Sequence, residues 1–157
     1  MKKGMKGFTE IVLGTIFLTQ IREKNRQIKY WRQNAEKSAQ IMRLYDQWMF
    51  IHQDHKSAYD YFVEKGIKSI AIYGMDNVGE RFYEELKDTD IKIAYAIDKK
   101  GGSINAEIKI VAPEDELERV DAIVVTAVYY FDEIFKNLSS KTDIPIISLE
   151  EILHEVR

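Results

Sequence analysis

Beyond Gly66 the sequence alternates short apolar runs with amphipathic stretches, and this alternation constrains the fold more than any other feature. The apolar runs are IKSIAIY, IKIAYAID, a weaker one at residues 108–111, AIVVTA and IPIIS. Helical patterns lie at VGERFYEELK, after Pro113 with its following acidic residues, at 131–138 and at 149–156. Strands this apolar are buried on both faces, and helices between them imply parallel pairing by right-handed crossovers. We therefore expect an α/β fold with a small parallel sheet of about five strands and helices on both faces.

Helices are expected to precede this pattern. The organisation predicted is a basic, partly apolar segment at residues 1–26, a helical region at 27–66 and the α/β domain at 67–157. In the helical region, one apolar set recurs near a seven-residue repeat: Ile28, Trp31, Ala35, Met42, Tyr45 and Met49. A second set, Ile41, Leu44, Trp48 and Ile51, is predicted to pack on the α/β domain. Residues 57–65 predict a short helix closed by Gly66.

The uncharged run IVLGTIFLTQI, residues 11–21, is shorter than the roughly 20 residues of a membrane-spanning helix. Basic residues flank it: Lys2, Lys3 and Lys6 before, and Arg22, Lys24, Arg26, Lys29 and Arg32 after. This pattern is typical of an interfacial helix on anionic lipid. Contact of residues 1–32 with an anionic membrane and docking on protein, including a homodimer through the N-terminal helices, both stay open. We expect a cytoplasmic protein, or one peripheral to the inner membrane face.

Charge divides the chain unevenly. Residues 1–66 hold 12 Lys and Arg against 7 Asp and Glu, a net charge of +5, and residues 67–157 hold 11 against 19, a net charge of −8. An acidic domain repels phosphate backbones, so nucleic acid is not an expected partner. The chain has no cysteine, which excludes disulfides, thiolate zinc sites and cysteine nucleophiles.

The segment from Ile72 to Gly79, IYGMDNVG, turns a buried strand sharply into a helix. It resembles the GxGxxG fingerprint of dinucleotide-binding Rossmann folds, in which the first glycine permits the turn and the last lets helix and strand pack closely. Gly74 and Gly79 match, whereas Asp76 replaces the middle glycine that lets pyrophosphate approach. Asp76 or Asn77 would alternatively cap the helix. We expect a small Rossmann-like domain preceded by N-terminal helices.

Further candidate binding residues follow the later strands. Asp98 ends the second strand, near the spacing of the acid that accepts hydrogen bonds from an adenosine ribose; the alternative is a turn aspartate before Lys99-Lys100-Gly101-Gly102. Thr126 and Ala127 end the AIVVTA strand and should border the same crevice. The candidate ligands are NAD and a nucleotide sugar, and the candidate residues are Gly74, Met75, Asp76, Asn77, Val78, Gly79, Asp98, Thr126 and Ala127.

Catalytic and metal-binding patterns are weak, and no residue is assigned to either role. Tyr61 and Lys65 form a YxxxK pair like that of short-chain dehydrogenases, but they precede the first strand, so we interpret the pair as chance. His52 and His55 have no third strong ligand in view. Residues 129–131, Tyr-Tyr-Phe, are expected to pack under the last crossover or to face the crevice.

The runs IAIYGMDNVGERFYEEL, IAYAID, DAIVVTAVYYFDEI and IPIISLEEIL resemble a Rossmann-like module of bacterial capsule and cell-surface polysaccharide proteins, over about residues 45–156. Such modules occur alone or fused to glycosyltransferases and methyltransferases. The resemblance implies a non-catalytic nucleotide-binding accessory module in surface glycan biosynthesis, with glycan enzymes as partners. Two alternatives stay open: an NAD-dependent sugar-nucleotide enzyme acting with a partner chain, and a structural or oligomerisation protein with a vestigial nucleotide site.

Overall fold

The computed structural model describes residues 2–99 and 108–157, with side chains from residue 14 onward. The chain divides into two compact units, Met1–Ala39 and Gln40–Arg157. The side chains of Lys2, Lys3 and Lys6 and the expected loop residues 100–102 lie outside the described residues.

The order of elements follows the predicted alternation. The helices are α1 Lys2–Gln53, α2 Ala58–Lys65, α3 Asn77–Leu86, α4 Phe131–Leu138 and α5 Leu149–Val156, with a 3₁₀ turn, η1 Val128–Tyr130, before α4. The strands are β1 Ser69–Tyr73, β2 Lys92–Ile97, β3 Ile110–Val111, β4 Ala122–Val125 and β5 Ile146–Ser148. One helix, α1, thus runs without a break across the expected boundary at residue 27.

The strands form one parallel sheet in the order β3-β2-β1-β4-β5. The chain moves outward from the central β1 through β2 and β3, then returns to the other side of β1 for β4 and β5. Tyr73 is level with Ile97 of β2 and Val125 of β4, so the carboxyl ends of these three strands meet at one edge. The predicted fold, a small Rossmann-like α/β sheet of five strands, is confirmed.

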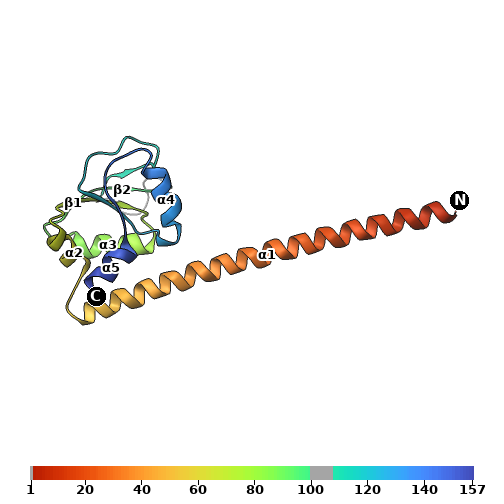
Figure 1. The fold of residues 1–157 in the computed structure, drawn as a ribbon, viewed down its shortest axis with the longest axis horizontal. Coiled ribbons are helices and arrows are strands. Elements are labelled where there is room, and N and C mark those ends of the chain that lie inside the picture. Colours follow the sequence, from red (N-terminus) through yellow and green to blue (C-terminus); the bar gives the residue numbers. More distant parts are fainter. Residues whose placement is uncertain (1, 100–107) are drawn as a thin grey trace. The chain divides into compact units, whose positions relative to one another are not determined.

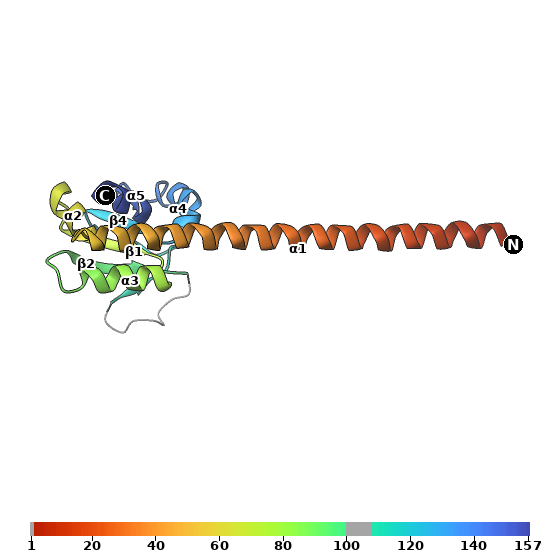
Figure 2. The ribbon, with the colours of Figure 1, turned by 90° about the horizontal axis from the view of Figure 1, so that it is seen from below.

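One face of the sheet carries the larger core. Ile70 and Ile72 of β1 point into it together with Ala122 and Val124 of β4, and residues of α1, α2, α3 and α5 cover them. In Figure 1, α3 and α5 lie below the strands. Figure 2, seen from below, shows the last turns of α1 crossing this face between α3 on one side and α5 on the other.

The opposite face carries a second core, because successive strand residues alternate between faces. Ala71 and Tyr73 of β1 and Ile123 and Val125 of β4 point to this side, and α4 covers them through Ile134 and Leu138. Helices therefore cover both faces of the sheet, as the strongly apolar strands predict.

The end of α1 within the second unit packs as expected for its second apolar set. Leu44, Trp48 and Ile51 are at most 5% exposed, and Ile41 packs partly buried against the same core. Of the heptad residues in this unit, Met42 and Met49 are 76% and 62% exposed, whereas Tyr45 packs partly buried against the same core. Among the described residues, no helix is both long enough and apolar enough to cross a membrane.

Glu85 of α3 joins three helices through its carboxylate. Its Oε2 accepts a hydrogen bond from the Trp48 indole N–H at 2.5 Å, and its Oε1 accepts one from the Ala58 backbone N–H at 2.7 Å. The Nε2 of His52 lies 3.0 Å from Oε2. The Glu85 side chain is only 10% exposed, so its carboxylate has few contacts with water. The hydrogen bonds from these donors take the place of those contacts. His52 is thus a partner of Glu85.

The prediction of a helix beginning at Pro113 is wrong. The chain makes a turn at residues 113–115 and then runs without regular structure to residue 121. The Asp115 carboxylate accepts the Ala112 backbone N–H at 2.8 Å, a local bond that favours a turn over a helix. The Tyr95 hydroxyl donates to the Glu118 carbonyl at 2.7 Å and so holds the following segment against β2. Of the acidic residues that suggested a first helical turn, Asp115 holds a tight turn instead.

Asp121 fastens the amino edge of the sheet just before β4. Its carboxylate accepts the backbone N–H of Lys68 at 2.9 Å and both the backbone N–H and the hydroxyl of Ser69, at 2.8 and 2.9 Å. The bond from the Lys68 N–H, followed by those from Ser69, holds the pKa of Asp121 below its ordinary value of 3.8.

This lowered pKa predicts a pH-dependent effect of Asp121→Asn. A carboxylate with a depressed folded-state pKa stabilises the fold above its unfolded-state pKa, and this contribution disappears as the pH falls through the folded-state pKa. We expect the loss in free energy of unfolding caused by Asp121→Asn to be greatest at neutral pH and to shrink as the pH falls below 3.8. Urea titrations of both proteins across this range measure it. A difference that stays constant with pH would contradict the prediction.

Candidate functional site

A crevice with a volume of about 420 Å³ opens at the carboxyl ends of the central strands. It lies where the connections leave β1 and β4 toward opposite sides of the sheet, the place where open α/β sheets usually bind ligands. Its lining residues are Tyr73, Gly74, Asp76, Asp98, Lys99, Ala127, Tyr130, Glu133 and Ile134. Four of these, Gly74, Asp76, Asp98 and Ala127, are among the residues that the sequence suggested.

The two glycines of the fingerprint have separate structural roles. Gly74 has φ +96°, a left-handed conformation that other residues rarely adopt, and a Cβ there would lie 3.1 Å from the Thr126 hydroxyl. A Cβ on Gly79 would lie only 2.0 Å from the Gly74 carbonyl oxygen. Gly74 therefore makes the turn, and Gly79 lets α3 approach it, which are the roles the fingerprint predicts for its first and last glycine.

Thr126, just after β4, holds the turn at Gly74 through its hydroxyl group. Its hydroxyl is 2.5 Å from the Gly74 carbonyl oxygen and 3.0 Å from that of Tyr73, and it is in position to donate its proton to them. The residue is only 3% exposed. Thr126 is therefore not among the residues that line the crevice, unlike its neighbour Ala127, and its hydroxyl is directed at the backbone of the turn.

Asp98 ties the end of β2 to the same turn. One carboxylate oxygen, Oδ2, accepts the backbone N–H of Met75 at 2.9 Å. The sequence offered two interpretations, a ribose-binding acid and a turn aspartate. Asp98 does hold a turn, but it is the one between β1 and α3. Because its side chain also lines the crevice, the ribose contact stays a prediction.

Asp76 occupies the N-cap position of α3, but its side chain makes no capping hydrogen bond to the helix. The alternative interpretation, in which Asp76 caps α3, is therefore right about the position of Asp76, but the expected hydrogen bond from its side chain to the helix is not formed. Asp76 and Asn77 are exposed, whereas Met75 and Val78 are buried in the core at 1% and 7% exposure. Of the residues between the two glycines, Asp76 is the one whose side chain lines the crevice, and Met75 and Val78 serve packing.

The sequence did not suggest Tyr73, Lys99, Glu133 or Ile134 as site residues, although all four line the crevice. Burial raises the pKa of the Tyr73 hydroxyl, and the carboxylates of Glu114, Asp98 and Glu133 raise it further. For residues 129–131 the sequence left two alternatives, packing under the last crossover and facing the crevice. Tyr130 lines the crevice, and the centre of its ring lies 5.2 Å from that of Tyr129. A usable signal was that Tyr73 ends the first strand and that Glu133 lies in the first turn of the helix after the fourth.

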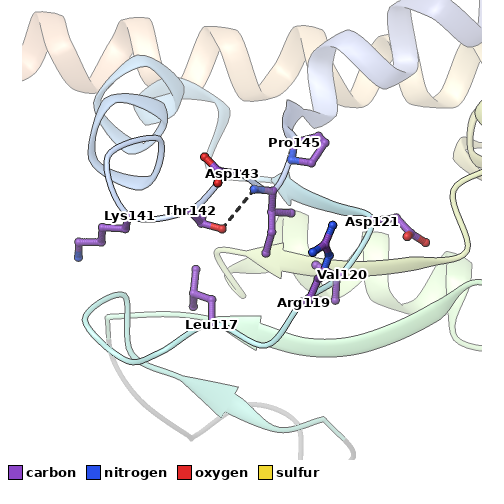
Figure 3. Close-up of a pocket in the computed structure, with 9 residues that line it drawn as sticks. Leu117, Arg119, Val120, Asp121, Lys141, Thr142, Asp143 and Pro145 are labelled. Atoms are coloured by element: carbon purple, nitrogen blue, oxygen red, sulfur yellow. Dashed lines mark hydrogen bonds between the residues drawn. The ribbon is translucent and has the colours of Figure 1, made fainter.

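A second cavity, of about 560 Å³, lies at the amino edge of the sheet, before β4 and β5 (Figure 3). Leu117, Arg119 and Asp121 line it from one segment, and residues 141–145 from the other. Its polar groups include pairs internal to the fold, since Asp121 holds β1 and the Lys141 ammonium donates to the Pro113 carbonyl at 3.1 Å. The dashed bond in Figure 3 joins the Ile144 N–H to the Thr142 hydroxyl. This cavity lies opposite the edge where such sheets usually bind ligands.

Tyr61 and Lys65 lie on α2, which leads into the amino end of β1, whereas the crevice is at its carboxyl end. Tyr61 is 7% exposed within the core, and the Lys65 ammonium lies 2.8 Å from the Glu155 carboxylate and 5.4 Å from the Tyr61 ring centre. Each residue thus has a structural environment remote from the crevice. In residues 14–99 and 108–157, no group of three or more His, Asp and Glu side chains is placed to hold a metal ion.

Sheet order, glycine turn and crevice together define a small α/β protein of Rossmann-like fold. Comparison with known proteins finds no match among family descriptions, curated proteins or solved structures.

Proposed function

We propose that this chain is a non-catalytic Rossmann-like binding module whose crevice takes a nucleotide ligand, either NAD or a nucleotide sugar. The observation that carries the proposal is the 420 Å³ crevice at the reversal point of the sheet, beside a glycine turn with its two structural glycines in place. Its carboxylates are suited to accept hydrogen bonds from sugar hydroxyls.

The position of Asp76 favours a nucleotide sugar over NAD. Its lining contains three carboxylates, Asp76, Asp98 and Glu133, against one ammonium, Lys99. NAD bound in the usual way would set its pyrophosphate against the turn that carries Asp76. Two unit charges about 4 Å apart repel by roughly 1 kcal/mol in water and roughly 4 kcal/mol at an effective dielectric constant of 20. A nucleotide sugar that lies along the crevice without crossing this turn avoids that repulsion.

In this proposal the module serves bacterial surface glycan biosynthesis beside glycan enzymes in the cytoplasm. The support is the resemblance of its strand and helix motifs to capsule and cell-surface polysaccharide proteins, IAIYGMDNVGERFYEEL above all.

The proposal predicts that Asp76→Gly improves NAD binding. The variant removes both a negative charge and a Cβ from the turn, so wild type should show little thermal stabilisation by NAD and the variant should show several degrees. Ligand at 100 times its dissociation constant stabilises by about 2.7 kcal/mol, at roughly 2 to 4 °C per kcal/mol for a chain of this size. Thermal melts with NAD and with a uridine-diphosphate sugar measure both responses, each protein referenced to its own ligand-free melt.

Asp88→Gly is the matched control, because it removes an exposed aspartate that does not line the crevice. A response to NAD by wild type that Asp76→Gly fails to increase would contradict the assigned role of Asp76. If neither ligand stabilises wild type or variant at millimolar concentration, the proposed function itself fails.

A further inference from the structure

The first unit consists of the α1 residues up to Ala39, and its described side chains include large apolar groups exposed to solvent. Phe17 is 63%, Ile28 58% and Trp31 69% exposed, and Ile16, Leu18 and Ile21 are between 39% and 56% exposed. Single long helices in water draw most of their stability from packing of an apolar face. Large apolar side chains exposed along one helix indicate a partner.

The spacing of these residues specifies the kind of partner. Positions repeat every seven residues, with Gly14, Ile21, Ile28 and Ala35 at one core position and Phe17, Lys24, Trp31 and Ser38 at the other. A seven-residue repeat in two positions keeps one seam of a helix facing another helix in a left-handed supercoil. The partner expected on this seam is therefore an α-helix.

We propose that residues 14–38 of α1 pair with the same residues of a second copy of this chain, in an antiparallel coiled coil. In the register centred between residues 24 and 28, Phe17 faces Ala35, Ile21 faces Trp31, and Gly14 faces Ser38 of the second copy. The bulky ring of Phe17 is thus matched by a small residue, and no aromatic ring faces another. Because the pairing is symmetric, the same matches occur on both halves.

Lys24 favours the antiparallel over the parallel arrangement of the two helices. In a parallel pair in register, Lys24 would face Lys24, Trp31 would face Trp31 and Phe17 would face Phe17. In the antiparallel pair Lys24 faces Ile28, where its stem covers apolar surface and its ammonium reaches water. The antiparallel arrangement thus removes one like-charge contact and two clashes of bulky rings.

The residues flanking the seam agree with the same register. Across the two-fold axis Gln27 meets Gln27 and Asn25 meets Asn25, Gln20 meets Asn34, and Leu18 meets Arg32. None of these pairs joins two like charges, which would oppose association. The basic residues Arg22, Arg26 and Lys29 take outer positions. The identical helix is thus a suitable partner for this seam.

Cysteine cross-linking tests the register directly, since the natural chain contains no cysteine. Full-length Lys24→Cys and Ile28→Cys proteins, one of them tagged, are mixed and oxidised under mild conditions. Core positions that face each other lie within disulfide reach, so the mixed disulfide should be the main product. Disulfides that form mainly between two copies of the same variant would indicate a parallel pair and overturn the antiparallel proposal.

Charge insertion tests the association itself. Wild type should sediment at twice the 18.4 kDa chain mass, and Ile28→Glu with Trp31→Glu should reduce the mass to that of one chain. Thr19→Glu with Gln33→Glu adds the same charge at exposed outer positions and should remain dimeric. Retention of the melting transition of the second unit excludes global unfolding as the cause. A dimer that survives the seam substitutions would overturn the proposal.

A vesicle sedimentation experiment distinguishes the dimer from the alternative in which residues 14–38 bind a membrane. Neither outcome depends on a ligand of the crevice. Wild type is sedimented with phosphatidylglycerol vesicles and with phosphatidylcholine vesicles. If wild type is monomeric at micromolar concentration and binds the anionic vesicles, lipid covers the seam and the dimer proposal is overturned. A dimer in the absence of vesicles supports it.

Discussion

Gly79→Ala should destabilise the second unit by about 3 kcal/mol or more. The added Cβ would lie 2.0 Å from the Gly74 carbonyl oxygen, and the contacted atom is backbone, so it cannot turn away as a side chain would. Either α3 moves off the sheet or the turn changes shape, and both separate the Phe82 side of the core from β1. Overpacking of a close contact typically costs about 1 to 3 kcal/mol, and a backbone clash lies at or above that range. Urea unfolding followed by tryptophan fluorescence measures the change.

Gly14→Ala is the matched control for this substitution. The same methyl group is added to a helix, but nothing lies within 4 Å of the new Cβ. We expect no loss in the stability of the second unit. Equal stability of Gly79→Ala and wild type would mean that α3 does not approach the turn as closely as described.

Glu85→Ala should also cost roughly 3 kcal/mol in free energy of unfolding. The change leaves the Trp48 indole N–H and the Ala58 backbone N–H without their shared acceptor at a part-buried position. Hydrogen bonds to a charged acceptor contribute about 1.5 to 3 kcal/mol each, and an unsatisfied buried donor costs about 1 to 3 kcal/mol. Thermal and urea unfolding measure the loss, and the Trp48 emission should shift because its environment changes.

The neighbouring Glu84→Ala provides the control, one position earlier on α3. Glu84 is exposed and pairs with Lys87 one turn away, an interaction worth about 0.5 kcal/mol or less. Similar losses for both variants would show that any shortened glutamate destabilises α3 and that the link from Glu85 to α1 and α2 carries no special weight.

Most of the fold was readable because the strands are short, apolar and separated by clear signals. The left-handed Gly66 ends α2 where predicted, and Leu44, Trp48 and Ile51 are buried as their spacing indicated. The exception is the segment after Pro113. Proline followed by acidic residues is common at helix starts, but also in turns, and the Asp115 bond to the Ala112 N–H determines which one forms. That bond depends on backbone geometry, which periodicity does not report.

The site was predictable in its place and less so in its parts. The fingerprint located the turn, since Gly74 and Gly79 perform the backbone roles that any residue with a Cβ would prevent. The roles of Thr126 and Asp98 were not predictable, because both depend on contacts of the turn after β1 with the ends of β4 and β2, which lie beside β1 in the sheet but far from it in the sequence. Glu133 was missed, although its place in the first turn of the helix after the fourth strand was a usable signal, and Tyr130 was left open between packing and the crevice until η1 placed it there.

The bond between the Asp98 carboxylate and the Met75 N–H has a consequence for how any ligand is received. Loops that bind phosphates often order themselves around their ligand, and the ordering reduces affinity. Here the Asp98 carboxylate and the Thr126 hydroxyl fix the turn from two neighbouring strands. The crevice is thus formed by the folding of the sheet itself, and its recognition would follow a lock-and-key scheme, in which selectivity comes from fit and charge.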